Sequence, residues 1–283
     1  MVMLKEEKTL QELVERGIKL PPQPRVLVEL ETRLGKGDPD VRELARIISQ
    51  DPGLTAMLFK AARSPLFNPR GRDLDKLDQV LMVIGIKQCL NLVRAIALSA
   101  SVPESNRRAF ESFWSRSREI ARLAALIADD RITVCNVFPD QAYLAGIFYE
   151  CGVPVLMQRF PEYCKSIQLG TVNCWPSLAE EDTRFNVDHG SIGYLVARHW
   201  KLPDFIAAAI HYHRELPPVE QGTTRSLAAI LQLAVHFFFR LNRLSDPHWT
   251  DLADEVLGEL CIATDDLSDF FDQISERFVS GEG

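Results

Sequence analysis

The sequence predicts an all-α protein, and three observations support this prediction. Apolar residues recur at helical spacing along almost the whole chain, capping residues stand before several of these segments, and strand candidates such as "RITV" (131–134) are short and isolated. The chain has 283 residues, of which 46% are hydrophobic, so it can bury a sizeable core.

Capping residues mark where three of the predicted helices begin. Asp40 precedes "VRELARIIS", and Asp51 with Pro52 opens "DPGLTAMLFKAAR", where proline suits the first helical position. Asp188 stands directly before "HGSIGYLVARHW", and we interpret it as an N-cap rather than as a catalytic acid.

Helical spacing predicts the remaining helices in the same way. The segments concerned include residues 86–100, 117–130 and 189–200. The apolar run from Leu227 to Phe239 is interrupted by Gln232 and His236 and is shorter than the ~20 residues that span a bilayer, so it predicts a buried helix.

The stretch "SVPESNRRA", near residue 103, suggests a boundary between two helical lobes. We therefore expect a bilobed chain with an N-terminal lobe in residues 1–103 and a second lobe in residues 104–283. The connections are short, so we expect the lobes to pack into one body.

Composition excludes several classes of protein. The formal net charge of −7 argues against a nucleic-acid-binding protein, because such binding depends on clustered Lys and Arg. The charged N-terminal stretch lacks the apolar region of a signal peptide, which predicts a cytoplasmic protein without a membrane anchor. Six scattered cysteines without a C-x-x-C pair give no zinc-knuckle or redox signature.

Several motifs carry a resemblance to a known family. The blocks "QDPGLTA" and "DHGSIGYLVARHWKLP", together with "FWSRSREIA" and "AYLAGIFYECGVPVL", closely resemble the HDOD family over about residues 18–215. HDOD proteins are helical relatives of the HD-superfamily metal-dependent phosphohydrolases. The resemblance implies an HD-like helical fold in the second lobe, with residues 216–283 forming additional helices.

Active HD hydrolases share a His, an adjacent His-Asp pair and a later Asp, which together hold divalent ions that clamp phosphate oxygens. By resemblance, the first His corresponds to Arg116 and the His-Asp pair corresponds to Tyr149-Glu150. Arginine does not lose its proton to become a ligand, and tyrosine is a poor ligand for hard divalent ions. We therefore expect neither a bound metal nor a cofactor.

Other residues could still contribute to a site in this region. Glu150 could coordinate an ion, and His189, His211 and His213 could supply imidazoles. Two histidines that are two positions apart on a helix point to different sides, so we do not expect His211 and His213 to share a metal. The alternative interpretation is that Glu150 is a paired carboxylate in a closed cavity and that the histidines cap or line helices.

The two replacements together predict an ion pair. In the metal-binding relatives, the first His and the Asp of the pair reach the same ion, so Arg116 and Glu150 should converge with opposite charges. We expect a direct contact within about 4 Å, with Tyr149 and His189 satisfying neighbouring lone pairs. This vestigial pocket comprises Arg116, Tyr149, Glu150, His189 and His211.

Two functions remain open. The resemblance implies a non-catalytic bacterial regulatory module that binds signalling proteins, such as phosphorelay or cyclic-dinucleotide components. The alternative is an atypical metal-dependent phosphohydrolase that acts on nucleotides or cyclic dinucleotides and uses Glu150 and His189 with unrecognised ligands. Bound metal in the purified protein would distinguish the two.

Overall fold

The computed structural model describes most of the chain, and every element in it is a helix. The described residues are 17–18, 20, 25–37, 40–63, 68, 71–99, 107–166 and 175–280. Within these ranges the structure has α-helices and short 3-10 helices and no strand, so the all-α prediction is confirmed.

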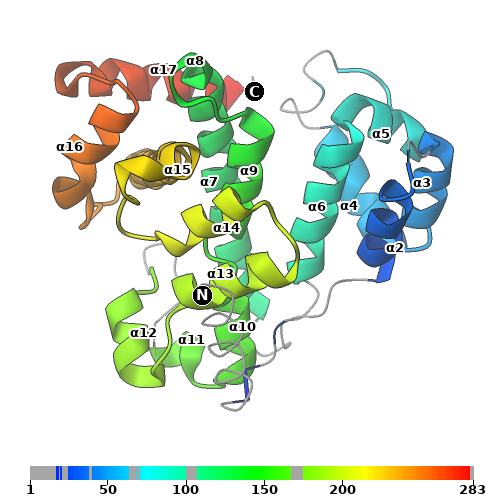
Figure 1. Cartoon of the computed structure of the whole chain (residues 1–283), viewed down its shortest axis with the longest axis horizontal. Helices are drawn as coiled ribbons and strands as arrows, with labels where there is room; N and C mark the ends of the chain where they lie inside the picture. Colours follow the sequence, from blue (N-terminus) through cyan, green and yellow to red (C-terminus); the bar gives the residue numbers. More distant parts are fainter. Residues whose placement is uncertain are drawn as a thin grey trace.

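The N-terminal helices form a group of their own, drawn in blue to cyan in Figure 1. They are α2 (Arg25–Leu34), α3 (Val41–Ile48), α4 (Pro52–Ala62), α5 (Leu77–Ile84) and α6 (Ile86–Ser99). The predicted caps are present, since the side chain of Asp40 accepts a hydrogen bond from the Arg42 amide and that of Asp51 accepts one from the Leu54 amide. Pro52 is the first residue of α4, as the sequence predicts.

The remaining helices make up the larger group. They are α7 (Arg107–Asp130), α8 (Ile132–Cys135), α9 (Pro139–Phe148), α10 (Gly152–Arg159), α11 (Tyr163–Ser166), α12 (Leu178–Phe185), α13 (His189–His199), α14 (Asp204–His211), η2 (Val219–Gln221), α15 (Gly222–Leu241), α16 (Trp249–Glu259), η3 (Thr264–Asp266) and α17 (Leu267–Ser280). Residues 131–134, a strand candidate in the sequence, lie instead at the short helix α8, where local backbone bonds such as that from the Cys135 amide to the Arg131 carbonyl close a helical turn.

Helices α7, α9 and α15 form the centre of the larger group (Figure 1). α7 and α9 approach closely because Gly146 has no side chain, and a Cβ there would lie 2.6 Å from the Cα of Ala121. In α15 every residue from Leu227 to Phe239 except His236 is buried, so the expected buried helix is present. The C-terminal helices therefore complete the main core.

The two-lobe expectation concerns a boundary at residue 103, which lies outside the described residues. On either side of that segment, α2–α6 lie together at one end of the view and α7–α17 lie together at the other (Figure 1). α6 packs against α9, so the two groups are in contact.

Candidate functional site

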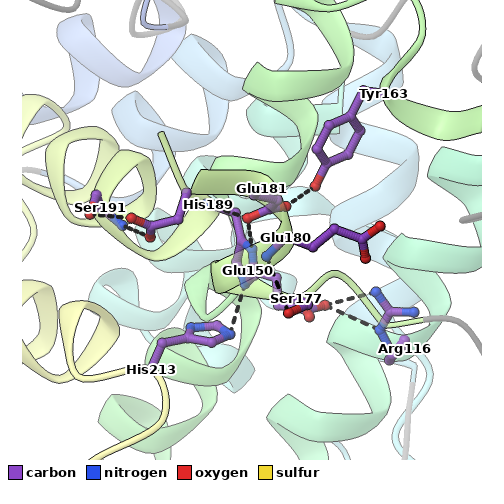
Figure 2. Close-up of polar contacts among 10 residues, drawn as sticks. Arg116, Glu150, Tyr163, Ser177, Glu180, Glu181, His189, Ser191 and His213 are labelled. Carbon is purple, nitrogen blue, oxygen red and sulfur yellow. Dashed lines mark hydrogen bonds and ion pairs between the residues drawn. The ribbon is translucent and has the colours of Figure 1, made fainter. Parts of the chain in front are cut away.

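The candidate site is built around a buried ion pair between α7 and the end of α9. Glu150 Oε2 accepts hydrogen bonds from Arg116 Nε at 3.1 Å and from Arg116 Nη2 at 2.9 Å. Arg116 lies in the middle of α7, and Glu150 follows the C-terminus of α9. The packing of α7 on α9 therefore brings the two side chains together (Figure 2).

The ion pair has almost no contact with solvent. The side chains of Arg116 and Glu150 are 3% and 1% exposed. The second carboxylate oxygen, Glu150 Oε1, is buried and has no hydrogen-bond partner among the described residues. Such an atom costs free energy unless a donor or a cation reaches it.

Tyr149 does not satisfy this oxygen, contrary to the expectation from the sequence. Its hydroxyl donates instead to the carbonyl of His213 at 2.5 Å, and its ring stacks on the His213 imidazole with centroids 3.9 Å apart. Burial raises the pKa of Tyr149 to about 12, so the phenol is neutral.

His189 makes no hydrogen bond to Glu150 Oε1 either, and takes part in a second polar chain, drawn in Figure 2. Its Nδ1 lies 2.6 Å from Glu181 Oε2, and the same oxygen accepts the His189 backbone amide at 2.8 Å. The other oxygen of Glu181 accepts the hydroxyl of Tyr163. Glu181 thereby satisfies a first-turn amide of α13 and holds the His189 ring.

Asp188 fixes the start of α13, as predicted. Its side chain accepts from the amide of Ser191 at 2.8 Å and also from the Ser191 hydroxyl. This N-cap places His189 as the first residue of the helix, facing the core.

His213 joins the site, whereas His211 does not. The His213 imidazole is buried, and its Nε2 lies 2.9 Å from His189 Nε2. Burial, with the neighbouring His189 and Arg214, holds the pKa of His213 well below its usual range, so this ring is neutral.

The inclusion of His211 in the pocket was wrong. Helix α14 ends at His211, which is exposed and packs against Tyr194, with ring centroids 5.3 Å apart. The chain leaves the helix before His213, so the helical spacing assumed for the two histidines does not apply. His213 turns into the core instead.

Aromatic and cationic groups close one side of the site. The Cζ atoms of Arg116 and Arg214 lie 4.7 Å and 5.5 Å from the Trp175 ring centroid. Trp175 in turn stacks on Phe238 of α15. The guanidinium of Arg116 is therefore held by an aromatic face as well as by its carboxylate.

Arg116 and Tyr149, which the resemblance assigns to hydrolase metal positions, do not fit a divalent ion, but three buried side chains nearby offer ligand atoms. Arg116, which corresponds to the first His by resemblance, carries a fixed positive charge. Glu150, His189 and His213 are all buried, and one ligand atom from each lies within 4.8 Å of the others. The arrangement offers two imidazole nitrogens and one carboxylate oxygen, which is a donor set that transition metals accept.

Sequence reasoning missed Glu181, Tyr163 and Gln232. Gln232 donates to the His213 carbonyl at 2.8 Å from helix α15. Glu181 had a local signal, because it shares the apolar face of α12 with Leu178 and Phe185, and a carboxylate on such a face needs a buried partner. Gln232 had a similar signal, because it interrupts the apolar run of a predicted buried helix, whereas Tyr163 carried none.

The chain belongs to the HDOD domain family, whose model matches residues 20–216. An "Uncharacterized protein" of Treponema pallidum is 23% identical over 228 residues, which are 80% of this chain and 44% of that protein. The chain thus spans less than half the length of this curated relative.

Three solved structures resemble the whole chain. A "Putative phosphohydrolase" from Shewanella amazonensis has a TM-score of 0.68 at 21% identity, covering 96% of this chain and 95% of that chain. A "Putative signal transduction protein" from Marinobacter aquaeolei has a TM-score of 0.72 at 20% identity, covering 98% and 64%. An HDOD domain protein with unknown function from Geobacter sulfurreducens has a TM-score of 0.66 at 20% identity, covering 100% and 97%. At these identities, the likeness establishes the fold.

None of the helices in the described part of the chain has both the length and the apolar character needed to cross a bilayer.

Proposed function

We propose that this HDOD protein is a non-catalytic regulatory module that acts by binding other proteins. The observation that carries the proposal is the ion pair between Arg116 and Glu150. The carboxylate at the family's metal position is engaged by a guanidinium, which repels the dication that phosphodiester hydrolysis requires.

Burial of the site supports the same proposal. Tyr149, Glu150 and His189 are at most 1% exposed, so a phosphodiester has no route to these groups without rearrangement of the surrounding helices. A hydrolytic site needs an open ligand position that water and substrate can reach.

The partners and the setting follow by analogy with the family. We propose that the partners are bacterial signalling proteins of phosphorelay or cyclic-dinucleotide systems and that the protein acts in the cytoplasm. The resemblance to a "Putative signal transduction protein" supports this proposal, as does the acidic composition, which does not suit nucleic acid.

A specific observation favours the alternative function. The cluster of Glu150, His189 and His213 could support an atypical metal-dependent phosphohydrolase acting on nucleotides or cyclic dinucleotides, and one structural relative is named a "Putative phosphohydrolase". Because these side chains are buried and closed to substrate, we rank the phosphohydrolase as the second candidate function.

A hydrolysis assay separates the two functions. Purified protein is incubated with cyclic dinucleotides and with a generic phosphodiester, with Mn²⁺ or Mg²⁺ supplied, alongside a Glu150→Gln variant. We expect no turnover, and any trace rate should be equal in the two proteins because it comes from a contaminant. A rate that Glu150→Gln abolishes would establish the hydrolase instead.

Affinity capture from the native cytoplasm, with mass-spectrometric identification, tests the binding role. We expect specific enrichment of signalling proteins relative to a heat-unfolded control. Failure to enrich any such protein above the control would contradict the regulatory role.

A further inference from the structure

A cleft lies between the N-terminal helix group and the larger group, and no residue of the vestigial pocket lines it. One wall comes from the corner between α5 and α6, and the other comes from α7, α9 and α17 (Figure 1). Its volume of about 690 Å³ is typical of small-molecule sites. We propose that this cleft binds a small amphipathic molecule with one anionic head group and an aliphatic body. The proposal goes beyond the proposed function, which concerns protein partners.

The start of α6 is the first argument for an anionic head group. Gly85 stands directly before this helix with a φ of 86°, and its carbonyl accepts a hydrogen bond from the Cys89 amide at 2.9 Å. Glycine has no side chain to cap the first-turn amides of Ile86, Lys87 and Gln88, and all three residues line the cleft. First-turn amides carry partial positive charge, so this end of the helix attracts an anion.

Gln88 adds a buried donor at the same helix end and is the second argument. It is only 8% exposed. Arg94 Nη1 donates to Asn91 Oδ1, and Asn91 Nδ2 donates to Gln88 Oε1, each at 3.3 Å. Because arginine can only donate, this chain fixes the orientation of both amides. Gln88 Nε2 therefore remains as a donor without a hydrogen-bond partner in the part of the chain that the structure describes.

This polar chain is anchored at its other end. Arg94 Nη2 pairs with Glu31 Oε1 of α2 at 2.6 Å, and both side chains are mostly buried. The ion pair holds Arg94 in place, and Arg94 in turn holds Asn91 and Gln88. The donor of Gln88 is thus preorganised for a ligand, which lowers the entropic cost of binding.

The charges of the two walls limit the ligand to one anionic group. Lys87 is exposed and adds a positive charge to the wall that α6 forms. On the other wall, Arg277 Nη2 and Asp129 Oδ2 lie 2.7 Å apart and neutralise each other. Asp140, in the first turn of α9, has no ion-pair partner among the described residues. A second anionic group on the ligand would meet this carboxylate and be repelled.

The rest of the lining favours an aliphatic body. It consists mainly of the aliphatic residues Ile84, Ile86, Ala125, Leu126 and Pro139. Tyr143 is the one aromatic residue that lines the cleft, whereas nucleobases usually stack on aromatic side chains. Fatty carboxylates and alkyl phosphate esters share the required chemistry. Both helix groups line the cleft, so such a ligand would bridge them and give the module a small-molecule input.

Isothermal titration calorimetry of the full chain tests the site with four probes of equal chain length: octanoate, octyl phosphate, 1-octanol and octanedioate. We expect one saturable equivalent of octanoate, octyl phosphate or both, and the tighter of the two identifies the head group. Octanol should bind at least about tenfold more weakly, because it lacks the charge that the amide donors stabilise. Octanedioate should also bind at least about tenfold more weakly, because its second carboxylate meets Asp140.

Two outcomes of this titration would overturn the site. The first is that neither anion binds with a Kd below about 1 mM. The second is that octanol or octanedioate binds as tightly as the better anion.

The variant Gln88→Glu tests the buried donor. A glutamate can still accept from Asn91, and an acid in the first turn suits a helix start, but it repels an anionic head group. We expect binding of the anionic probes to weaken at least about tenfold while that of octanol is retained. Gln50→Glu makes the same change at an exposed position outside the cleft and should bind as the wild type does.

Undiminished binding of the anionic probes by folded Gln88→Glu would refute the assignment. If this variant does not fold, the comparison of the four probes on the wild type decides the proposal by itself. Failure of the probes to bind would leave the proposed regulatory function intact, and failure to capture a protein partner would leave this site intact.

Discussion

Arg116 and Glu150 are costly to separate even though their pairing contributes little net stability. Both groups are desolvated, which offsets much of their attraction, but either one alone would be an uncompensated buried charge. We expect Arg116→Ala to lower the free energy of unfolding by about 3–5 kcal/mol. Urea unfolding followed by circular dichroism, with EDTA present throughout, measures this loss.

The double variant Arg116→Met/Glu150→Leu should recover much of the stability, because it removes both charges and keeps the volume. Arg118 is exposed on the same helix and provides the control, since Arg118→Ala should change the free energy of unfolding by no more than about 0.5 kcal/mol. A double variant as unstable as Arg116→Ala would show that lost packing, and not an unpaired charge, causes the effect.

The cysteine thiols should differ sharply in reactivity. Burial raises the pKa of Cys89 to about 12 and that of Cys151 still further, so both stay protonated at neutral and mildly alkaline pH. Cys261 is exposed. We expect iodoacetamide to alkylate Cys261 in the native protein and to spare Cys89 and Cys151, because the thiolate is the reactive form.

Peptide mapping by mass spectrometry measures this labelling, and protein unfolded in urea provides the control in which all three thiols react. Labelling of native Cys151 at the rate of Cys261 would mean that the α10–α13 region opens readily.

At the residue scale, the sequence predicted the contact between Arg116 and Glu150 but missed the polar chain that joins Glu181, His189 and His213. The contact between Arg116 and Glu150 could be predicted because two substitutions at converging positions have opposite charges. The role of Glu181 could not, because it depends on how α12 packs against the start of α13. The choice between His211 and His213 depended on one helix ending at His211, and helix ends are poorly defined by sequence.

At the scale of elements, the crossing of α10 and α13 depends on a residue without a side chain. A Cβ at Gly152 would lie 2.1 Å from the carbonyl oxygen of His189 and 2.9 Å from the amide nitrogen of Gly193. These are backbone atoms, so they cannot rotate away. The first turn of α13, which carries His189, is therefore positioned by direct contact with α10.

We expect Gly152→Ala to lower the free energy of unfolding by at least about 1–3 kcal/mol, because the helices must separate to admit the methyl group. Gly258, in α16, has open space where a Cβ would lie and provides a matched control. Gly258→Ala should be neutral or stabilising by up to about 1 kcal/mol. Thermal unfolding of the two variants makes the comparison, and equal melting temperatures would contradict the close approach.

Helix starts were the most predictable features at this scale. Asp40, Asp51 and Asp188 each act as the N-cap that the sequence indicates. A cap is a contact between near neighbours in the chain, so local sequence contains the information. The close approach of α10 to α13 involves residues far apart in sequence, so no local pattern predicted it.

At the scale of the whole molecule, the helices that form the core extend beyond the residues matched by the family model. The match ends at residue 216, yet α15 lies beyond it and packs against α7, α9 and α14. α17 also reaches back to α7, where Arg277 bonds Asp129 at 2.7 Å. The resemblance described residues 216–283 only as additional helices, because packing across such distances has no local signature.

We expect a chain truncated after residue 216 to be insoluble or to lack cooperative unfolding. Loss of α15 would expose the apolar faces of α7 and α9 to water, and exposed patches of this kind promote aggregation. Truncation after residue 280 should leave the melting temperature unchanged. Size-exclusion chromatography with calorimetry distinguishes the two outcomes, and a monomeric 1–216 chain with a sharp transition would contradict the prediction.

The hydrogen bond from Gln232 to the His213 carbonyl also has a consequence for synthesis. Ribosomes work from the N-terminus at about 5–20 residues per second, so α15 is made about a few seconds after His213 and far later than Arg116. During that interval the His213 carbonyl lacks the hydrogen bond from Gln232. The core of the protein is therefore completed as one of the last events of its production, when the ribosome has released α15.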